Sequence, residues 1–504
     1  MAIGAALSIL LVALLVAGGG SHPAAAATAI IGDGSSFAGI ELQQWQNDVG
    51  RAPYNLNVNY QSNSSGQGRQ DFANHVVDFA VSDIRYVGQP YDVNPPPASS
   101  FEYVPVTAGG VAIMYNLQKE GFTQSAKALQ LSPLTVCGIF TGAIKYWDDD
   151  ALKADNPGVT LPHVQLRPVV RQDPAGTNYV MEEYCIAEEP ALYAQFVTSA
   201  TQINGTGYPD APTSTWPIIN PIIGATTSDG VADAVAATND DGYVTMVETG
   251  YADQRHFPVA AVKNDTGAYV LPTDVAVASA LSFATQQPDG THVLNFRPGD
   301  AKAYNPSTYS YLLMPLTGIA ASKGAALTQF AEYCLTIGQQ EASRLGYASI
   351  GRALIQFGLQ RVQQVPGYVA PTSAELAAIP GQSTGTSGAT TTTAATSGTS
   401  ATTATTAAAS LHTTVTTTGA ATSGATTRVA SSTGGGSAPF SSGALSAAAG
   451  GTVDASATLD PTATGPLSHT GIESDVVLGV GIALVAMGEV GRRRYRRSRS
   501  IRLS

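Results

Sequence analysis

The sequence predicts an α/β head of two lobes carried on a disordered stalk. Short β-rich runs alternate with Gly/Ser-rich turns and helix-like segments over residues 30–370, which is typical of an α/β fold with mostly parallel strands. A head of this length exceeds what one hydrophobic core normally serves, so two lobes are expected. Residues 371–466 are mostly Thr, Ala, Ser and Gly, and they lack the apolar mass that would offset chain entropy.

The N-terminus predicts a secretion signal over residues 1–29. Residues 3–17 form an apolar run, and small side chains at 25, 27 and 29 suit cleavage after Ala27 or Ala29. No Lys or Arg precedes the run, which departs from the common pattern. No Cys stands at the cleavage point, which argues against a lipoprotein anchor.

The C-terminus, residues 467–504, predicts an anchor at the extracellular face of the cell envelope. LSHTG at 467–471 precedes an apolar stretch and the basic tail RRRYRRSRS. This order resembles a sortase cell-wall sorting signal, with cleavage between Thr470 and Gly471, although Ser468 stands where the common motif has Pro. The alternative is a plain membrane anchor held inside by its Arg cluster.

Charge and cysteine content narrow the function. The formal net charge is −12, so a nucleic-acid binder is excluded and any bound anion must be held by local donors. The three Cys form no CxxC or Cys/His cluster, so neither a metal site nor a cofactor is expected. Cys137–Cys185 is the favoured disulfide, and three unpaired thiols are the alternative. No catalytic motif such as HExxH is present, so the protein is not expected to be an enzyme.

Three strand–turn–helix junctions share one design. They are GDGSSF (32–37), NSSGQGRQ (63–70) and RQDPAGTN (171–178). Each places Gly and hydroxyl residues at a helix N-terminus, where unpaired N–H groups and the helix dipole can bind an anion. None is a P-loop or a dinucleotide fingerprint. Ordinary helix caps are the alternative, but three such turns in one head favour a small oxyanion site.

Two kinds of charged residue sharpen this hypothesis. The planar fork of Arg171 suits an oxyanion, and Asp173 can fix its orientation. Asp83, at the end of a strand, would repel an anion unless the anion carries a proton. Protonated phosphate can donate to Asp83, whereas sulfate would leave this acceptor unpaired. A surface ion pair and a turn cap are the alternatives.

At these residues the sequence resembles the PstS-type phosphate-binding proteins of ABC transporters. The resemblance covers about 30–370 and is carried by GDGSSF, NYQSNSSGQGRQDFANHVVDFAVSD and RQDPAGT. GIFTGAIKYWDDD (138–150), DGYVTMVETGYA (241–252) and RLGYASI (344–350) also fit. One position departs, because Ala175 replaces the family's Ser. Its N–H is expected to remain available, while the hydroxyl is lost.

The resemblance implies a two-lobed periplasmic-binding-protein-like (type II) fold, with a ligand cleft between the lobes. Lobe 1 would comprise 30–107 and 304–370, and lobe 2 would comprise 108–303. The implied partners are inorganic phosphate and an ABC permease. The alternatives are a surface adhesin or display protein on the same fold, and a binder of another oxyanion. Asp173 would brace Arg171, and the implied phosphate-binding residues are Ser36, Phe37, Ser65, Asp83, Arg171, Ala175, Gly176 and Thr177.

Overall fold

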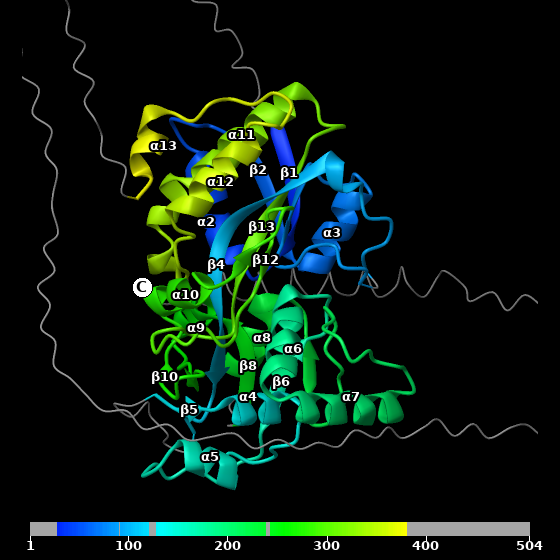
Figure 1. The fold of residues 1–504 in the computed structure, drawn as a ribbon, viewed down its shortest axis with the longest axis vertical. Coiled ribbons are helices and arrows are strands. Elements are labelled where there is room, and N and C mark those ends of the chain that lie inside the picture. The colour runs from blue at the N-terminus through cyan, green and yellow to red at the C-terminus, as the bar shows by residue number, and fades with distance from the viewer. Residues whose placement is uncertain (1–27, 90, 120–127, 238–241, 381–504) are drawn as a thin grey trace, which may run out of the picture. The chain divides into compact units, whose positions relative to one another are not determined.

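The computed structural model describes residues 28–89, 91–119, 128–237 and 242–380. They form the two-lobed α/β fold that the sequence predicts, in which one sheet continues from the first lobe into the second (Figure 1). The expected signal segment lies almost wholly outside the described residues. The sorting signal lies entirely outside the described residues, and so does most of the expected stalk.

The main sheet has the strand order β2-β1-β3-β13-β4-β8-β6-β7. Strand β1 pairs in parallel with β2 and β3, and β6 pairs in parallel with β7 and β8. Between these groups, β13 and β4 run antiparallel to their neighbours, so the pairing is less uniformly parallel than the sequence suggested. The strands are β1 (Ala29–Ser35), β2 (Asn57–Asn63), β3 (Phe79–Ser82), β4 (Phe101–Tyr115), β6 (Arg167–Arg171), β7 (Ile223–Ala225), β8 (Tyr243–Glu248) and β13 (Ser307–Pro315).

Small sheets complete the β-structure of the described residues. One has the order β10-β9-β5, and the other is the hairpin β11-β12. Their strands are β5 (Gln130–Leu131), β9 (Ala261–Lys263), β10 (Tyr269–Val270), β11 (Thr285–Gln286) and β12 (His292–Val293).

Strand β4 connects the lobes. Its residues up to Gly110 pair with β13, and its residues from Val111 onward pair with β8. The strand is buried along its whole length, because both lobes pack against it. The chain returns to lobe 1 through β13. The lobe limits near 107 and 303 stay a prediction.

Helices flank both parts of the sheet. In lobe 1, α11 packs against β1 and α12 against β4, while α3 contacts β1 and β3 on the other side (Figure 1). In lobe 2, α8 packs against β6 and β8. The α-helices are α2 (Gly39–Val49), α3 (Ser65–Ala73), α4 (Pro133–Phe140), α5 (Asp150–Asp155), α6 (Gly176–Glu188), α7 (Pro190–Asn204), α8 (Thr227–Ala236), α9 (Thr249–Arg255), α10 (Asp274–Leu281), α11 (Ala321–Leu335), α12 (Arg352–Val362) and α13 (Ser373–Ala378); short 3₁₀ turns are η1 (Ala98–Ser100), η2 (Ile337–Gln340) and η3 (Ser343–Leu345).

A disulfide links α4 to α6 in lobe 2. It joins Cys137 to Cys185, the pair that the sequence favoured, with Cα atoms 5.7 Å apart. Cys334 is a free, buried thiol in α11. Because α6 begins at Gly176, the crosslink fixes the helix whose N-terminus belongs to the third predicted junction.

The expected start of the stalk at residue 371 is too early. Residues 373–378 form α13, which begins with a capping box between Thr372 and Glu375. The Tyr54 hydroxyl donates to Glu375 at 3.0 Å, and Ile379 is buried in the core. The head therefore extends to at least residue 380. The Thr-x-x-Glu pattern at Thr372 and Glu375 could have predicted this helix, but the composition around it resembles that of the stalk.

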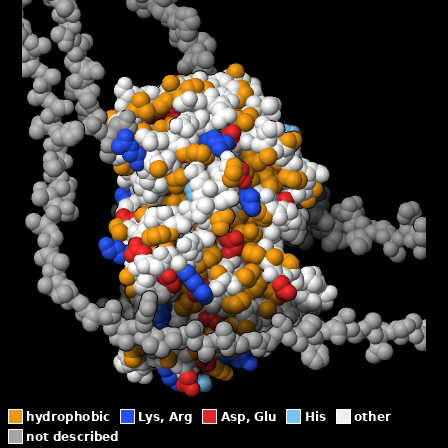
Figure 2. Space-filling model, viewed as in Figure 1, with side chains coloured by type: hydrophobic (Ala, Val, Ile, Leu, Met, Phe, Trp, Pro, Cys, Tyr) orange, Lys and Arg blue, Asp and Glu red, His pale blue; other side chains and the backbone are white. Residues whose placement is uncertain are grey.

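The surface carries few charges. On the face in Figure 2, Lys, Arg, Asp and Glu side chains are scattered singly or in mixed groups among uncharged ones. No broad field of one sign covers this face, as the low charge content suggested. Within the described ranges, we find no helix with the length and apolarity needed to cross a bilayer.

Candidate anion-binding site

The three junctions predicted from the sequence meet where the two lobes touch. Lobe 1 contributes the turns after β1 and β2, and lobe 2 contributes the turn after β6. The N–H of Gly66 donates to the Pro174 carbonyl at 2.8 Å, directly across the contact. Arg171 Nη2 donates to the Asn63 carbonyl at 3.1 Å, also across it. The N-termini of α3 and α6 thus lie together at the contact between the lobes.

Asp83 is the buried acceptor on the lobe 1 side, with 5% of its surface exposed. Its Oδ1 accepts from Ser35 Oγ at 2.6 Å and from Ser310 Oγ at 2.7 Å. Its Oδ2 accepts from Ser65 Oγ at 2.9 Å. Burial raises the pKa of Asp83 above its ordinary value, while the three hydroxyls and Arg171 act in the opposite direction.

The hydrogen bonds of Asp83 leave it one acceptor position. A carboxylate has about four lone-pair sites, two on each oxygen. Two bonds occupy Oδ1, whereas Oδ2 receives one from the described residues. The remaining position is therefore on Oδ2, the oxygen that lies against Gly176 at the N-terminus of α6. A group that reaches it must carry a proton.

Arg171 is the buried cation on the lobe 2 side, with 1% of its surface exposed. Its Nε donates to Asp173 Oδ1 at 2.7 Å, and its Nη2 makes a shorter bond to Oδ2, which together form a bidentate pair. Asp173 also accepts from the backbone N–H of Thr227 at 3.3 Å. Asp173 therefore holds the guanidinium in a fixed orientation, as expected of a bracing residue.

Backbone N–H groups from both lobes lack acceptors at this site. Within the described residues, the N–H groups of Phe37, Ser65, Gly176 and Thr177 make no hydrogen bond to the protein. All four residues are buried, and buried N–H groups without a partner are rare in proteins. Four such donors from both lobes, together with the buried Arg171, suit an oxyanion with several equivalent oxygens.

The close approach of the lobes requires glycine at position 176. A Cβ atom there would lie 2.4 Å from Asp83 Oδ2 and 2.5 Å from its Cβ. Asp83 cannot retreat easily, because three serines hold its carboxylate. A Cβ at Gly66 would likewise lie 2.6 Å from the Pro174 Cβ. The close contact between the lobes therefore requires glycine at positions 66 and 176.

A second carboxyl group lies on the lobe 2 side. Glu248, at the end of β8, is fully buried, and its Oε1 accepts from Thr177 Oγ1 at 3.4 Å. Its Oε2 has no hydrogen-bond partner among the described residues. Burial raises the pKa of Glu248 to about 8, opposed by a hydrogen bond from Ser228 and by the charge of Arg171.

Ser228 connects the lobes beside this carboxyl. Its N–H donates to Ser36 Oγ at 2.9 Å, and its Oγ lies 3.1 Å from the same hydroxyl. Arg171 Nη1 donates to Ser228 Oγ at 3.4 Å. Ser228 lies in the first turn of α8, so the N-terminus of this helix also reaches the site.

Comparisons with known proteins agree with this architecture. A family model described as a PBP superfamily domain matches residues 19–336. The chain belongs to the PBP superfamily. One relative of this PBP-superfamily chain is the phosphate-binding protein PstS of Methanocaldococcus jannaschii, 28% identical over 359 residues, covering 66% of this chain and 85% of the relative. Another is the phosphate-binding protein PstS of Xylella fastidiosa (strain Temecula1), 28% identical over 329 residues, covering 65% and 83%.

Solved structures share the fold of this PBP-superfamily chain. The crystal structure of a DING protein aligns with a TM-score of 0.50 at 18% identity and covers 68% of this chain and 100% of that one. The X-ray structure of a human phosphate binding apolipoprotein aligns with the same values. At this identity the likeness concerns the fold alone, and it agrees with the two-lobed prediction.

The structure brings the predicted site residues together, with one correction. Ala175 was expected to offer its N–H, but this group donates to the Ser214 carbonyl at 2.9 Å. Its methyl side chain offers no cap to α6 either. Ala175 therefore supplies no donor to the site, because the backbone turns its N–H toward the neighbouring loop.

Sequence reasoning missed four side chains at the site: Ser35, Ser228, Glu248 and Ser310. Ser228 had a usable signal, because GATTSDG repeats the Gly and hydroxyl pattern of the other junctions before a helix. Ser310 had none, because it lies 227 residues from Asp83 and reaches it only through the pairing of β13 with β3. Glu248 looked like an ordinary strand end.

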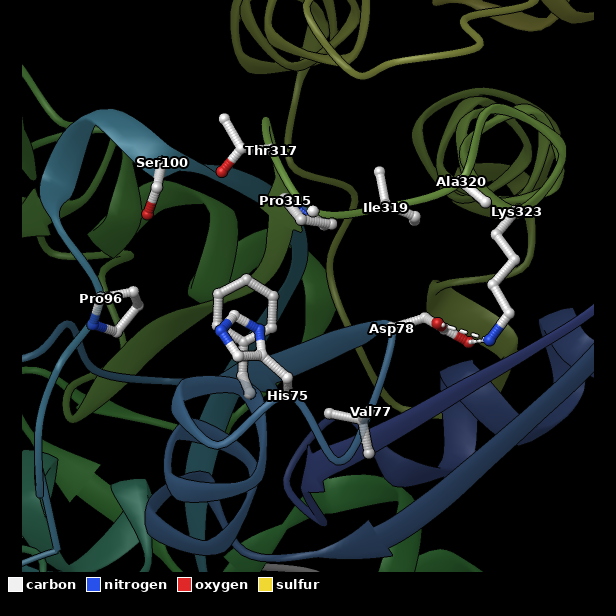
Figure 3. A pocket seen from close by; sticks show the side chains of 12 residues that line it. His75, Val77, Asp78, Pro96, Ser100, Pro315, Thr317, Ile319, Ala320 and Lys323 are labelled. Atoms are coloured by element: carbon white, nitrogen blue, oxygen red, sulfur yellow. Dashed lines mark hydrogen bonds and ion pairs between the residues drawn. The ribbon is translucent and has the colours of Figure 1, made fainter.

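A separate cavity of about 290 Å³ lies in lobe 1, between the start of α11 and the loop before β3 (Figure 3). Lys323 Nζ faces it but is paired with Asp78 at 2.7 and 2.9 Å. The lysine that lines this cavity is therefore already paired and gives no reason to assign an anion site there. The described residues contain no cluster of His, Cys, Asp and Glu that could hold a metal ion.

Proposed function

We propose that this chain is a receptor that captures inorganic phosphate between its two lobes. The observation that carries the proposal is the remaining acceptor position on Asp83 Oδ2, buried at the contact between the lobes to which Arg171 and four N–H donors also belong. A neutral-pH phosphate offers both of the groups that this site needs: oxygens for the donors and a proton for Asp83. The names of the PstS relatives support the same ligand.

Sulfate is the ligand that this arrangement excludes. It has the size and geometry of phosphate but carries no proton at neutral pH, so the buried Asp83 would face it with an unpaired acceptor and a like charge. An unmet buried acceptor costs about 1–3 kcal/mol, and more for a charged group. We therefore infer selectivity for an anion that can donate.

Binding between the lobes accounts for closure. A ligand that contacts residues of both lobes stabilises the closed arrangement by its differential affinity. We further propose that the head is tethered at the outer face of the cell envelope and delivers phosphate to an ABC permease. These two points rest on the predicted leader, the LSHTG-type segment and the resemblance described above.

Calorimetric titration of the full chain with phosphate and then sulfate at pH 7 tests the proposal. We expect phosphate to bind with micromolar or tighter affinity and sulfate to give no signal. Equal binding of both anions would contradict the role of Asp83. No binding of either anion by a folded chain would favour the display or adhesin alternative, which the missing donors at Ala175 also fit.

A further inference from the structure

Glu248 has no assigned role in anion binding, yet it lies among the groups that would perform it. It contacts Thr177 at 3.4 Å and hydrogen-bonds with Ser228. Ser228 in turn contacts Arg171 and Ser36. One oxygen of this fully buried carboxyl, Oε2, has no partner among the described residues. A polar group so placed needs a reason, because leaving it unpaired is costly.

Charge at the site argues against an ionised Glu248. Arg171 is the cation that acts on it, and Asp173 already neutralises this guanidinium through a bidentate pair. Asp83, at the end of β3, also acts on Glu248 and raises its pKa. An ionised Glu248 would thus be a further negative charge beside Asp83 and the incoming anion.

Other elements around Glu248 bring no compensating charge. Tyr251 of α9 and Tyr347 interact with it electrostatically, and burial holds the pKa of both phenols well above the ordinary value. The pKa of Glu248 itself is raised to about 8, chiefly by burial. The neutral acid is therefore the form that the site holds at pH 7.

We propose that Glu248 acts as a neutral positioning acid that turns the hydroxyl proton of Thr177 toward the bound anion. A protonated carboxyl can donate its one proton to the Thr177 hydroxyl oxygen, which leaves the Thr177 hydroxyl proton free for the ligand, while Ser228, whose Oγ already accepts from Ser36 and Arg171, donates to Glu248. An ionised carboxylate accepts only, so both hydroxyls would donate to Glu248 instead. The inference rests on the proposed function.

The direction of the pH effect follows from the raised pKa. The competent, protonated form predominates below pH 8 and is lost as pH rises through that value. Each pH unit above it lowers the protonated fraction about tenfold, and the apparent affinity falls in proportion. Phosphate also changes its own ionisation in the lower part of this pH range, but it does so equally for every variant, so the difference between variants reports on Glu248.

The test is calorimetric titration of the full chain with phosphate from pH 7 to 9.5, comparing wild type with Glu248→Gln. Gln donates and accepts but cannot ionise. We expect wild type to lose about tenfold more affinity than Glu248→Gln between pH 7 and 9. Glu332→Gln is the matched control, because burial raises the pKa of Glu332 to about 8 as well. Glu332 lies in α11, outside the site, so this variant should keep the wild-type profile.

The outcomes separate the two proposals. Identical pH profiles for wild type and Glu248→Gln, with phosphate bound by both, would overturn the role of Glu248 and leave the proposed function standing. No phosphate binding by wild type at any pH would overturn both. Should Glu248→Gln not fold, titration of wild type at pH 8.5 in buffers of different ionisation enthalpy replaces it. Binding should take up at least about half a proton, and zero uptake would overturn the inference.

Discussion

The two lobes contribute different chemical groups to the candidate site. Lobe 1 presents a buried carboxylate, Asp83, held by three serine hydroxyls. Lobe 2 presents a buried guanidinium, Arg171, held by Asp173, together with the N-terminus of α6. The groups of lobe 2 thus attract an anion, whereas Asp83 of lobe 1 distinguishes an anion that has a proton from one that has none. Selectivity and affinity are therefore separable by mutation.

The largest expected effect is on the side that attracts the anion. Arg171→Ala removes the buried cation that would pair with the anion, and truncating one partner of a buried charge pair costs about 3 kcal/mol of binding free energy, so phosphate affinity should fall at least about a hundredfold. Calorimetric titration measures it. The matched control is Arg297→Ala, which removes an exposed ion pair with Glu188 and should change affinity little. A similar loss in both variants would argue against a special role for Arg171.

Closure of the lobes is the next test of the comparison. Gly176→Ala places a Cβ 2.4 Å from Asp83 Oδ2, so the two sides can no longer meet. Overpacking of about 1–3 kcal/mol should weaken phosphate binding roughly five- to a hundredfold, while the melting temperature of the free protein changes less. Gly207→Ala is the control, since a Cβ there meets nothing within 4 Å. Unchanged affinity in Gly176→Ala would show that the ligand binds outside this contact.

The smallest expected change in phosphate affinity comes from adding the hydroxyl that Ala175 lacks at the N-cap of α6. Ala175→Ser adds a hydroxyl at the N-cap of α6 and should strengthen phosphate binding about two- to tenfold, the value of one hydrogen bond. It should also stabilise the helix. Ala320→Ser, at the equally uncapped N-terminus of α11, separates these effects. That control should raise the melting temperature without changing affinity, and weaker binding in Ala175→Ser would place the ligand elsewhere.

Local patterns predicted more of this protein than distant ones. Gly and hydroxyl residues predict the turn after β1 and the first turns of α3 and α6, because helix capping depends on residues close together in the sequence. The sequence therefore placed Ser65, Arg171 and Gly176 in one site. Ser310 and Glu248 join them only through strand pairing and burial, which no short motif reports.

The C-terminal boundary of the head and the direction of one backbone N–H were also predicted wrongly. The composition of residues 371–380 resembles the stalk, yet Ile379 and Glu375 pack against the head. The N–H of Ala175 was assigned to the ligand because the loop motif places it there, but the direction of a single N–H depends on the neighbouring Ser214 loop. The N–H direction depends on a tertiary contact, whereas the boundary had a local signal in the capping box of Thr372 and Glu375.

The most direct measurement is the phosphate-to-sulfate affinity ratio of Asp83→Asn against wild type at pH 7. An Asn amide can donate to sulfate and carries no charge, so sulfate should bind and the ratio should fall about tenfold or more. Asp78→Asn, outside the site beside Lys323, should keep the wild-type ratio. An unchanged ratio in Asp83→Asn would contradict the claim that this carboxylate recognises the proton of the bound anion.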